Sequence, residues 1–140
     1  MHMTYAGDLT PQQAWDLLRE HPRAVLVDVR TEAEWRFVGL PDLAELGREP
    51  LTIEWVSFAG ERNTAFVDQL QAAGVTGGDD AEVIFLCRSG QRSIGAAEAA
   101  TAAGIAPAYN VLDGFEGGLD DTGHRGGAGW RSVGLAWRQS

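Results

Sequence analysis

The sequence predicts an α/β domain in which helices cover both faces of a mostly parallel central sheet. Apolar runs typical of buried strands occur at residues 24–29, 81–87 and 108–112. Helical patterns lie between these runs, and strands that alternate with helices favour a parallel sheet. At 140 residues, 44% of them hydrophobic, the chain has enough apolar material for one packed core. We therefore expect a single domain over residues 10–138.

The N-terminal half is expected to begin with a helix after Thr10, because Thr10 can cap it and Pro11 suits its first position. Thr31 and Glu34 have the spacing of a capping box, which predicts a second short helix over residues 31–35. Turn signals follow at residues 39–42 and 47–50. Between the turns, residues 51–56 alternate as a half-buried strand does.

In the C-terminal half, Asn63 can cap a helix that runs through Ala73. A loop of five residues follows the strand at 81–87 and leads into an alanine-rich helix over residues 93–103. Residues 113–128 are rich in glycine and are expected to be irregular. Trp130, Val133 and Trp137 fall at helical spacing, which predicts a helical tail packed on the domain, with partner binding as the alternative.

Composition and charge exclude several function classes. The formal net charge of -9 opposes binding to phosphate backbones, so nucleic acid is not an expected partner. No apolar run approaches the ~20 residues that cross a bilayer, and no secretory signal opens the chain, so we expect no membrane partner and a cytoplasmic location. One Cys and three scattered His lack zinc-ligand spacing, and no nucleotide-binding motif is present. We expect neither a metal nor a cofactor.

The segment that can carry chemistry is Cys87-Arg88-Ser89-Gly90-Gln91-Arg92, between a buried strand and a helix. The first amides of a helix lack intrahelical partners and favour an anion. Gly90 permits a tight curl, and Arg88 and Arg92 add positive charge. These effects favour a thiolate, so we expect Cys87 to be nucleophilic. The alternative is an inert core cysteine, since free Cys is among the most buried residue types.

Three segments resemble the rhodanese family, specifically its single-domain members. They are Cys-Arg-Ser-Gly-Gln-Arg-Ser at 87–93, Val-Asp-Val-Arg-Thr-Glu-Ala-Glu-Trp at 27–35 and Asn-Val-Leu-Asp-Gly-Phe-Glu-Gly-Gly at 110–118. The resemblance implies a thiosulfate sulfurtransferase-like enzyme of rhodanese-like fold, with Cys87 as the catalytic nucleophile. Cys87 would take sulfur from a donor such as thiosulfate as a persulfide and pass it to a thiol or a cyanide-like acceptor. A small-molecule sulfur donor and a thiol acceptor are thus the expected partners, with a sulfur-relay protein as a further candidate.

The resemblance also implies roles for the neighbouring residues. The loop would bind the donor and the persulfide charge through Arg88, Ser89, Gly90, Gln91 and Arg92, with a plain solvent-exposed side chain as the alternative for Arg88. Supporting roles fall to Asp28, Arg30 and Ser93. We expect Arg92 to turn inward to Asp28, and Arg30 to pair with Glu34. The family's Gly-His-Ile-Pro-Gly-Ala-like segment is replaced here by Gly-Leu-Pro-Asp at 39–42, without the His, so the resemblance does not define that wall of the site.

Two other functions remain as alternatives. A Cys-dependent phosphatase or arsenate reductase also places a thiolate at a helix N-terminus, but its signature has Arg six positions after Cys. Here that position is Ser93, and Arg92 stands at five. A non-catalytic rhodanese-like module that binds a partner or senses redox state is the second alternative, which the presence of Cys87 disfavours. His124 is expected to be a loop residue rather than a general base.

Overall fold

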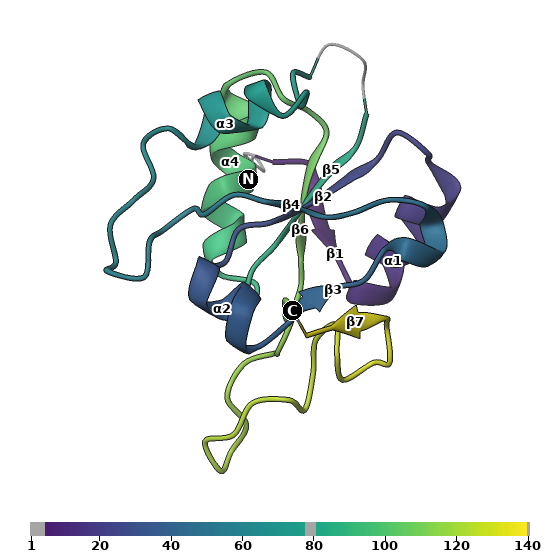
Figure 1. Cartoon of the computed structure of the whole chain (residues 1–140), viewed down its shortest axis with the longest axis vertical. Helices are drawn as coiled ribbons and strands as arrows, with labels where there is room; N and C mark the ends of the chain where they lie inside the picture. The colour runs from purple at the N-terminus through teal and green to yellow at the C-terminus, as the bar shows by residue number, and fades with distance from the viewer. Residues whose placement is uncertain (1–4, 78–80, 140) are drawn as a thin grey trace.

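The computed structural model describes residues 5–77 and 81–139 (Figure 1). Its main sheet has five strands in the order β1-β6-β5-β2-β4, and every neighbouring pair is parallel. The strands are β1 (Gly7–Leu9), β2 (Val25–Asp28), β4 (Leu51–Thr52), β5 (Val83–Leu86) and β6 (Ala108–Val111). The predicted parallel sheet is confirmed.

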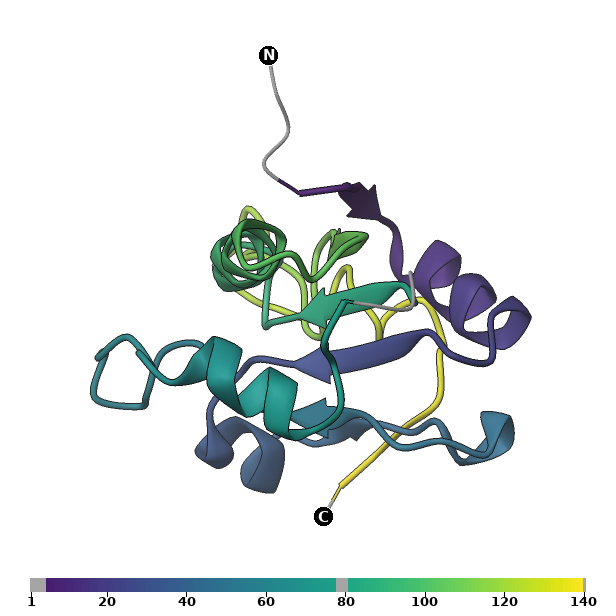
Figure 2. The same ribbon diagram turned by 90° about the horizontal axis from the view of Figure 1, so that it is seen from above.

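Helices cover both faces of this sheet, as Figure 2 shows, with α1 on one side and α3 and α4 on the other. The helices are α1 (Pro11–Glu20), α2 (Glu32–Phe37), α3 (Phe66–Ala72) and α4 (Arg92–Ala102), with a short 3₁₀ turn at Ala44–Leu46. The expected layered α/β arrangement is therefore confirmed.

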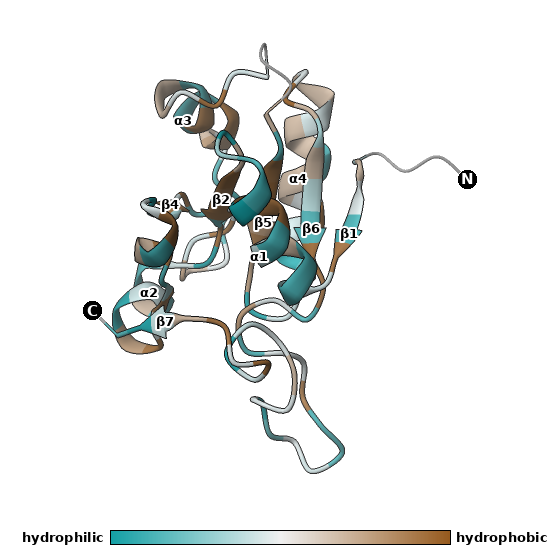
Figure 3. Ribbon diagram, turned by 90° about the vertical axis from the view of Figure 1, so that its right-hand side faces the viewer, coloured by the Kyte–Doolittle hydropathy of each residue, from teal (hydrophilic) through white to brown (hydrophobic). Residues whose placement is uncertain are grey.

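Alternation along the central strands divides the core into two layers. Val27 and Phe85 pack on the side of α3 and α4, whereas Leu26 and Ile84 pack with Trp15 of α1 on the other side. Successive side chains of a strand point to opposite faces, so a run buried on both faces must be apolar throughout. Figure 3 shows β2 and β5 as hydrophobic strands in the middle of the sheet.

Local capping signals place the first two helices. Thr10 and Thr31 each form a complete capping box, with Gln13 and Glu34 as the reciprocal partners. Each box satisfies two backbone groups that a helix end leaves free. The start of α2 was thus predicted correctly, although the helix continues to Phe37.

Asn63 does not cap α3, contrary to the prediction. Its Oδ1 accepts a hydrogen bond from the Ala65 N–H at 3.1 Å, while its Nδ2 donates to the Glu54 carbonyl at 2.7 Å. It therefore shapes the turn before the helix, which begins only at Phe66. The predicted strand at 51–56 is also shorter, since β4 ends at Thr52.

The C-terminal tail is not helical. Trp130 is fully buried against Trp15, whereas Val133 is 53% exposed, so the spaced residues do not share one buried stripe. Gly129 and Gly134 have φ values of 95° and 86°, and this left-handed backbone interrupts a helix. Instead, β7 (Trp137–Arg138) pairs antiparallel with β3 (Leu40–Pro41), where a turn was predicted.

Among the described residues, no helix has the length and apolar character needed to cross a membrane.

Candidate active site

Cys87 lies directly after β5, at the carboxyl end of the sheet, and the loop that follows it joins α4 at Arg92. The thiol is only 1% exposed. The Gly90 N–H donates a hydrogen bond to Sγ of Cys87 at 3.1 Å. Gly90 has a φ of 92°, and a Cβ there would lie 3.0 Å from the Asp113 nitrogen, so glycine is needed for this close curl.

A buried polar network extends from the sulfur to the edge of the sheet. The Ser93 hydroxyl lies 3.2 Å from Sγ of Cys87 and also contacts Oδ1 of Asn110. The Asn110 amide nitrogen in turn donates to Asp8 at 3.1 Å and to the Gly90 carbonyl at 3.3 Å. The sequence prediction included Ser93 but missed Asn110. The sequence signal that could have found it is a polar residue inside the apolar run at 108–112, and the structure shows this residue fully buried.

The segment after β6 supports the loop from behind. The Phe115 N–H donates to the Cys87 carbonyl at 2.8 Å, and the Glu116 N–H donates to the Arg88 carbonyl at 2.9 Å. Gly114 has a φ of 57°, and a Cβ at this position would lie 2.3 Å from the Cys87 carbonyl oxygen. Only a residue without a side chain allows the two segments to approach so closely.

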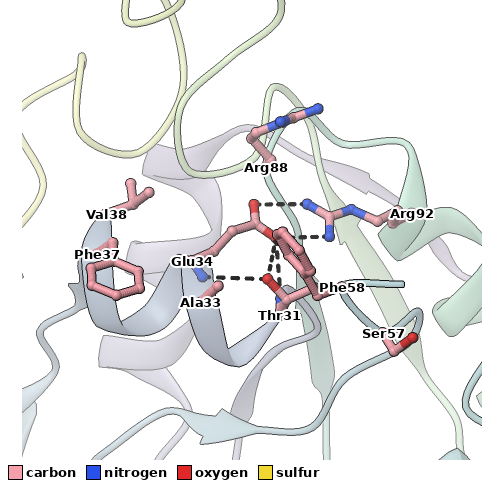
Figure 4. Close-up of a pocket in the computed structure, with 9 residues that line it drawn as sticks. All are labelled: Thr31, Ala33, Glu34, Phe37, Val38, Ser57, Phe58, Arg88 and Arg92. Carbon is pink, nitrogen blue, oxygen red and sulfur yellow. Dashed lines mark hydrogen bonds and ion pairs between the residues drawn. The ribbon is translucent and has the colours of Figure 1, made fainter. Parts of the chain in front are cut away.

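The predicted ion pairs are exchanged in the structure. Arg92 forms a bidentate ion pair with Glu34, in which Nη1 lies 2.9 Å from Oε1 and Nη2 lies 3.0 Å from Oε2 (Figure 4). Arg30 instead pairs with Asp28, with Nη2 lying 2.7 Å from Oδ2. Residues two positions apart in an extended chain point to the same side, so Asp28 meets Arg30. Glu34, on the first turn of α2, is left to face the sulfur loop.

The Glu34–Arg92 pair shifts the pKa of both groups. Burial opposes the charge of Glu34, but hydrogen bonds from Arg92 and from the Thr31 N–H outweigh it and lower the pKa of Glu34. Burial likewise opposes the charge of Arg92, while Glu34 raises the pKa of Arg92, with a smaller contribution from Cys87. Both side chains are therefore held in their charged forms.

The remaining loop residues differ in exposure. Arg88 and Gln91 are exposed, and Ser89 is half-buried. Of the loop amides expected to surround the sulfur, the structure shows the Gly90 N–H donating to it. In Figure 4 the Arg88 guanidinium points away from the Glu34–Arg92 pair. Arg88 thus offers the exposed charge of this loop, whereas the charge of Arg92 is already paired.

A cleft of about 500 Å³ opens beside the loop. Arg88 and Arg92 form its side nearest Cys87, and Phe37 and Phe58 contribute apolar walls (Figure 4). The other lining residues are Thr31, Ala33, Glu34, Val38 and Ser57. Cys87 is not among the residues that line this space, in keeping with its 1% exposure.

No group of three His, Cys, Asp or Glu side chains that could hold a metal ion occurs within residues 5–77 and 81–139. His124 lies in an exposed loop, where its backbone N–H donates to Asp120 at 2.9 Å. This hydrogen bond holds His124 in the turn that begins at Asp120.

Comparisons with solved structures identify the fold. The crystal structure of Rv0390 from M. tuberculosis is 62% identical, with a TM-score of 0.88, and the match covers 97% of this chain and 99% of that one. A rhodanese-like domain protein from Staphylococcus aureus matches at 22% identity and a TM-score of 0.58, over 93% and 96% of the two chains. The polysulfide-sulfur transferase homodimer from Wolinella succinogenes matches at 23% identity and a TM-score of 0.63, over 98% of this chain and 80% of that chain.

At their low identities, the last two matches show the fold alone. The family described as "STR4 middle domain" matches residues 7–140, which is nearly the whole chain. The chain therefore belongs to the STR4 middle domain family, and its fold is that of the rhodanese-like proteins.

Proposed function

We propose that this protein is a sulfurtransferase that carries sulfur on Cys87 as a persulfide. The observation that supports this most is the position of the sulfur. Sγ of Cys87 lies at the end of a buried parallel strand, within a glycine loop that leads into α4, and it accepts a hydrogen bond from the Gly90 N–H. A donor of this kind favours negative charge on sulfur.

The reaction proceeds in two displacements. The Cys87 thiolate attacks the outer sulfur of thiosulfate, the sulfur–sulfur bond of the donor breaks, and sulfite leaves with the bonding electron pair. A thiolate or cyanide acceptor then attacks the terminal sulfur of the persulfide. The Cys87 thiolate leaves and is ready for another donor.

The charges of the loop suit different parts of this reaction. Arg88 is exposed beside the cleft and would bind the oxygens of an anionic donor. Arg92 is held by Glu34, so its role is to fix the loop next to α2. Because the sulfur is 1% exposed, the loop has to shift before a donor reaches it.

The direct test is intact mass spectrometry after incubation with thiosulfate. We expect a gain of one sulfur atom, reversal by cyanide, and no gain in Cys87→Ser. An unchanged mass across thiosulfate, polysulfide and a persulfide donor would contradict the proposal. Hydrolysis of p-nitrophenyl phosphate that depends on Cys87 would favour the phosphatase alternative instead.

A further inference from the structure

The cleft beside the sulfur loop continues across α2 as a longer groove. A second cleft, of about 530 Å³, shares Ala33, Phe37, Ser57 and Phe58 with the first and extends to Glu32, Arg36 and Glu54. We call the two clefts together the α2 groove. One end of the α2 groove thus lies at the sulfur loop, and the other lies beyond the first turn of α2.

The middle of the α2 groove is bordered by aromatic side chains with little cover. Phe37 is 75% exposed and Phe58 is 84% exposed, more than any other large hydrophobic side chain in the described part of the chain. A ligand that covers these rings gains from the removal of their apolar surface from water. Exposed apolar surface next to a polar rim is typical of a binding site.

The charge changes sign along the α2 groove. At the sulfur end, Arg88 is exposed, and among the described residues no acidic side chain pairs with it. At the far end lie Glu32 and Glu54, with Arg36 3.2 Å from Glu32. A ligand that fits both ends therefore has an acidic group near the sulfur and a basic group at a distance from it.

We propose that the α2 groove binds an extended polypeptide segment of the sulfur acceptor. This segment has an acidic residue beside its cysteine, an apolar side chain between Phe37 and Phe58, and a basic residue towards Glu32 and Glu54. A thiol the size of cysteine fills only a small part of the two clefts and cannot contact both charged ends. This inference rests on the proposed sulfurtransferase function, because it names the acceptor of the same site.

The test uses the persulfide form of the full chain, loaded with thiosulfate and freed of donor. Its discharge is measured with cyanide, with the peptide Glu-Cys-Gly-Leu-Gly-Lys-Lys, and with the charge-reversed peptide Lys-Cys-Gly-Leu-Gly-Glu-Glu. We expect a KM about tenfold lower for the first peptide than for the second. In Phe37→Ala/Phe58→Ala, the KM for the first peptide should rise about tenfold or more, with a smaller change in cyanide discharge.

Leu119→Ala is the matched control, since Leu119 is 63% exposed and does not line the α2 groove. Equal KM values for the two peptides would overturn the proposal, as would an equal loss with peptide and cyanide in the double variant. Failure to load sulfur at all would instead contradict the proposed function.

A different observation carries a second inference, about the buried network at Cys87. The Asn110 amide nitrogen faces two acceptors, Asp8 and the Gly90 carbonyl, so its Oδ1 faces Ser93. An amide oxygen only accepts, and the Ser93 hydroxyl has a single proton. While the Ser93 hydroxyl donates this proton to Oδ1 of Asn110, it cannot donate to Sγ of Cys87, which lies 3.2 Å away.

We infer that Asn110 is a positioning residue that directs the Ser93 proton away from Cys87. In the thiol form, Cys87 S–H then donates to Oγ of Ser93. In the thiolate form, the Ser93 hydroxyl has to turn to the sulfur and leave Oδ1 of Asn110 without a donor. The charged groups around this network are Arg92, which interacts electrostatically with Cys87, and Asp8, which accepts a hydrogen bond from the Asn110 amide; neither gives or receives the Ser93 proton.

The rate of Cys87 alkylation at neutral pH tests this inference. Asn110→Leu frees the Ser93 proton to stabilise the thiolate, so alkylation should be about tenfold faster, whereas Ser93→Ala removes the donor and should slow it by a similar factor. Changes of equal sign in the two variants would overturn the inference.

A second measurement does not depend on the folding of Asn110→Leu. The chain has one cysteine, so the infrared S–H stretch reports on Cys87 alone. We expect this frequency to rise in Ser93→Ala, because the S–H group loses its acceptor. An unchanged frequency would contradict the assignment.

Discussion

Two arginine–carboxylate pairs lie near the sulfur loop, and they differ in burial and in reach. Asp28 and Arg30 are both 0% exposed and stand two residues apart, whereas Glu34 and Arg92 are 17% and 26% exposed and stand 58 residues apart. The first pair joins two nearby residues at the end of β2. The second connects Glu34 of α2 to Arg92, the first residue of α4, directly after the sulfur loop.

The surroundings of the two pairs show what each one contributes. Arg30 lies 4.2 Å above the Phe115 ring and donates to the Gly39 carbonyl at 2.6 Å. Its Nη1 is buried without a hydrogen-bond partner in the described part of the chain. A fully buried pair gives little net stability but is costly to break, because one charge then remains in the core. A partly exposed pair contributes little free energy either when it forms or when it breaks, so it is better suited to a loop that moves.

The largest effect is expected from Asp28→Asn, which leaves the Arg30 charge uncompensated in the core. The free energy of unfolding should fall by about 3–5 kcal/mol. Urea denaturation measures this loss, and Asp28→Asn/Arg30→Met should be less destabilised than Asp28→Asn because no charge remains. Losses that simply add in the double variant would show that the two residues act independently.

A smaller effect on stability is expected from Glu34→Gln, which removes the charge that faces Arg92. We expect a loss of about 1 kcal/mol, because the pair is partly screened by solvent. Sulfur loading from thiosulfate should slow more than stability alone explains, since the loop loses its contact with α2. Normal loading in this variant would mean that the pair does not position the loop.

The free energy of unfolding should depend on pH differently in the wild type and in Glu34→Gln. The pKa of Glu34 is lowered in the folded state, so its ionised form stabilises the fold above the ordinary carboxyl range. This contribution is lost as the pH falls through the lowered value. The difference between the two proteins in urea denaturation should therefore be largest near neutral pH and shrink in acid, and a constant difference would argue against the ion pair.

The smallest effect is expected from Glu32→Gln. Glu32 and Arg36 form an exposed pair four residues apart on α2, with side chains 72% and 66% exposed. Such pairs contribute about 0.3–0.5 kcal/mol. Thermal unfolding of Glu32→Gln should thus be almost that of the wild type, which makes this variant the control for Glu34→Gln on the same helix.

The sequence predicted best those features that depend on neighbours in the chain. Thr10 and Thr31 cap helices because the capping box needs only residues three positions apart. The partners of Arg30 and Arg92 were exchanged because several carboxylates were available and the sequence does not contain the direction of each side chain. The tail was wrong for a related reason. Trp130, Val133 and Trp137 have helical spacing, but the left-handed backbone at Gly129 and Gly134 and the pairing with the distant strand β3 determine the path of the tail.

The candidate site was predicted in outline from its loop. Cys87, Gly90 and Ser93 lie together as expected, while Asn110 joins them from β6 through the parallel register, which places it opposite Asp8. Contacts of this kind depend on strand order, which no local pattern determines.

The cover over Cys87 also sets the sizes of molecule that can meet the sulfur at each stage. A thiol that is 1% exposed admits only a narrow donor when the loop shifts. Once loaded, a persulfide places its terminal atom about 2 Å further from the backbone, the length of a sulfur–sulfur bond. Under the proposed function, loading would then favour compact inorganic compounds, whereas the extended sulfur would lie within reach of bulkier acceptors. The burial of one atom would thereby set different size limits for the two half-reactions of the proposed cycle.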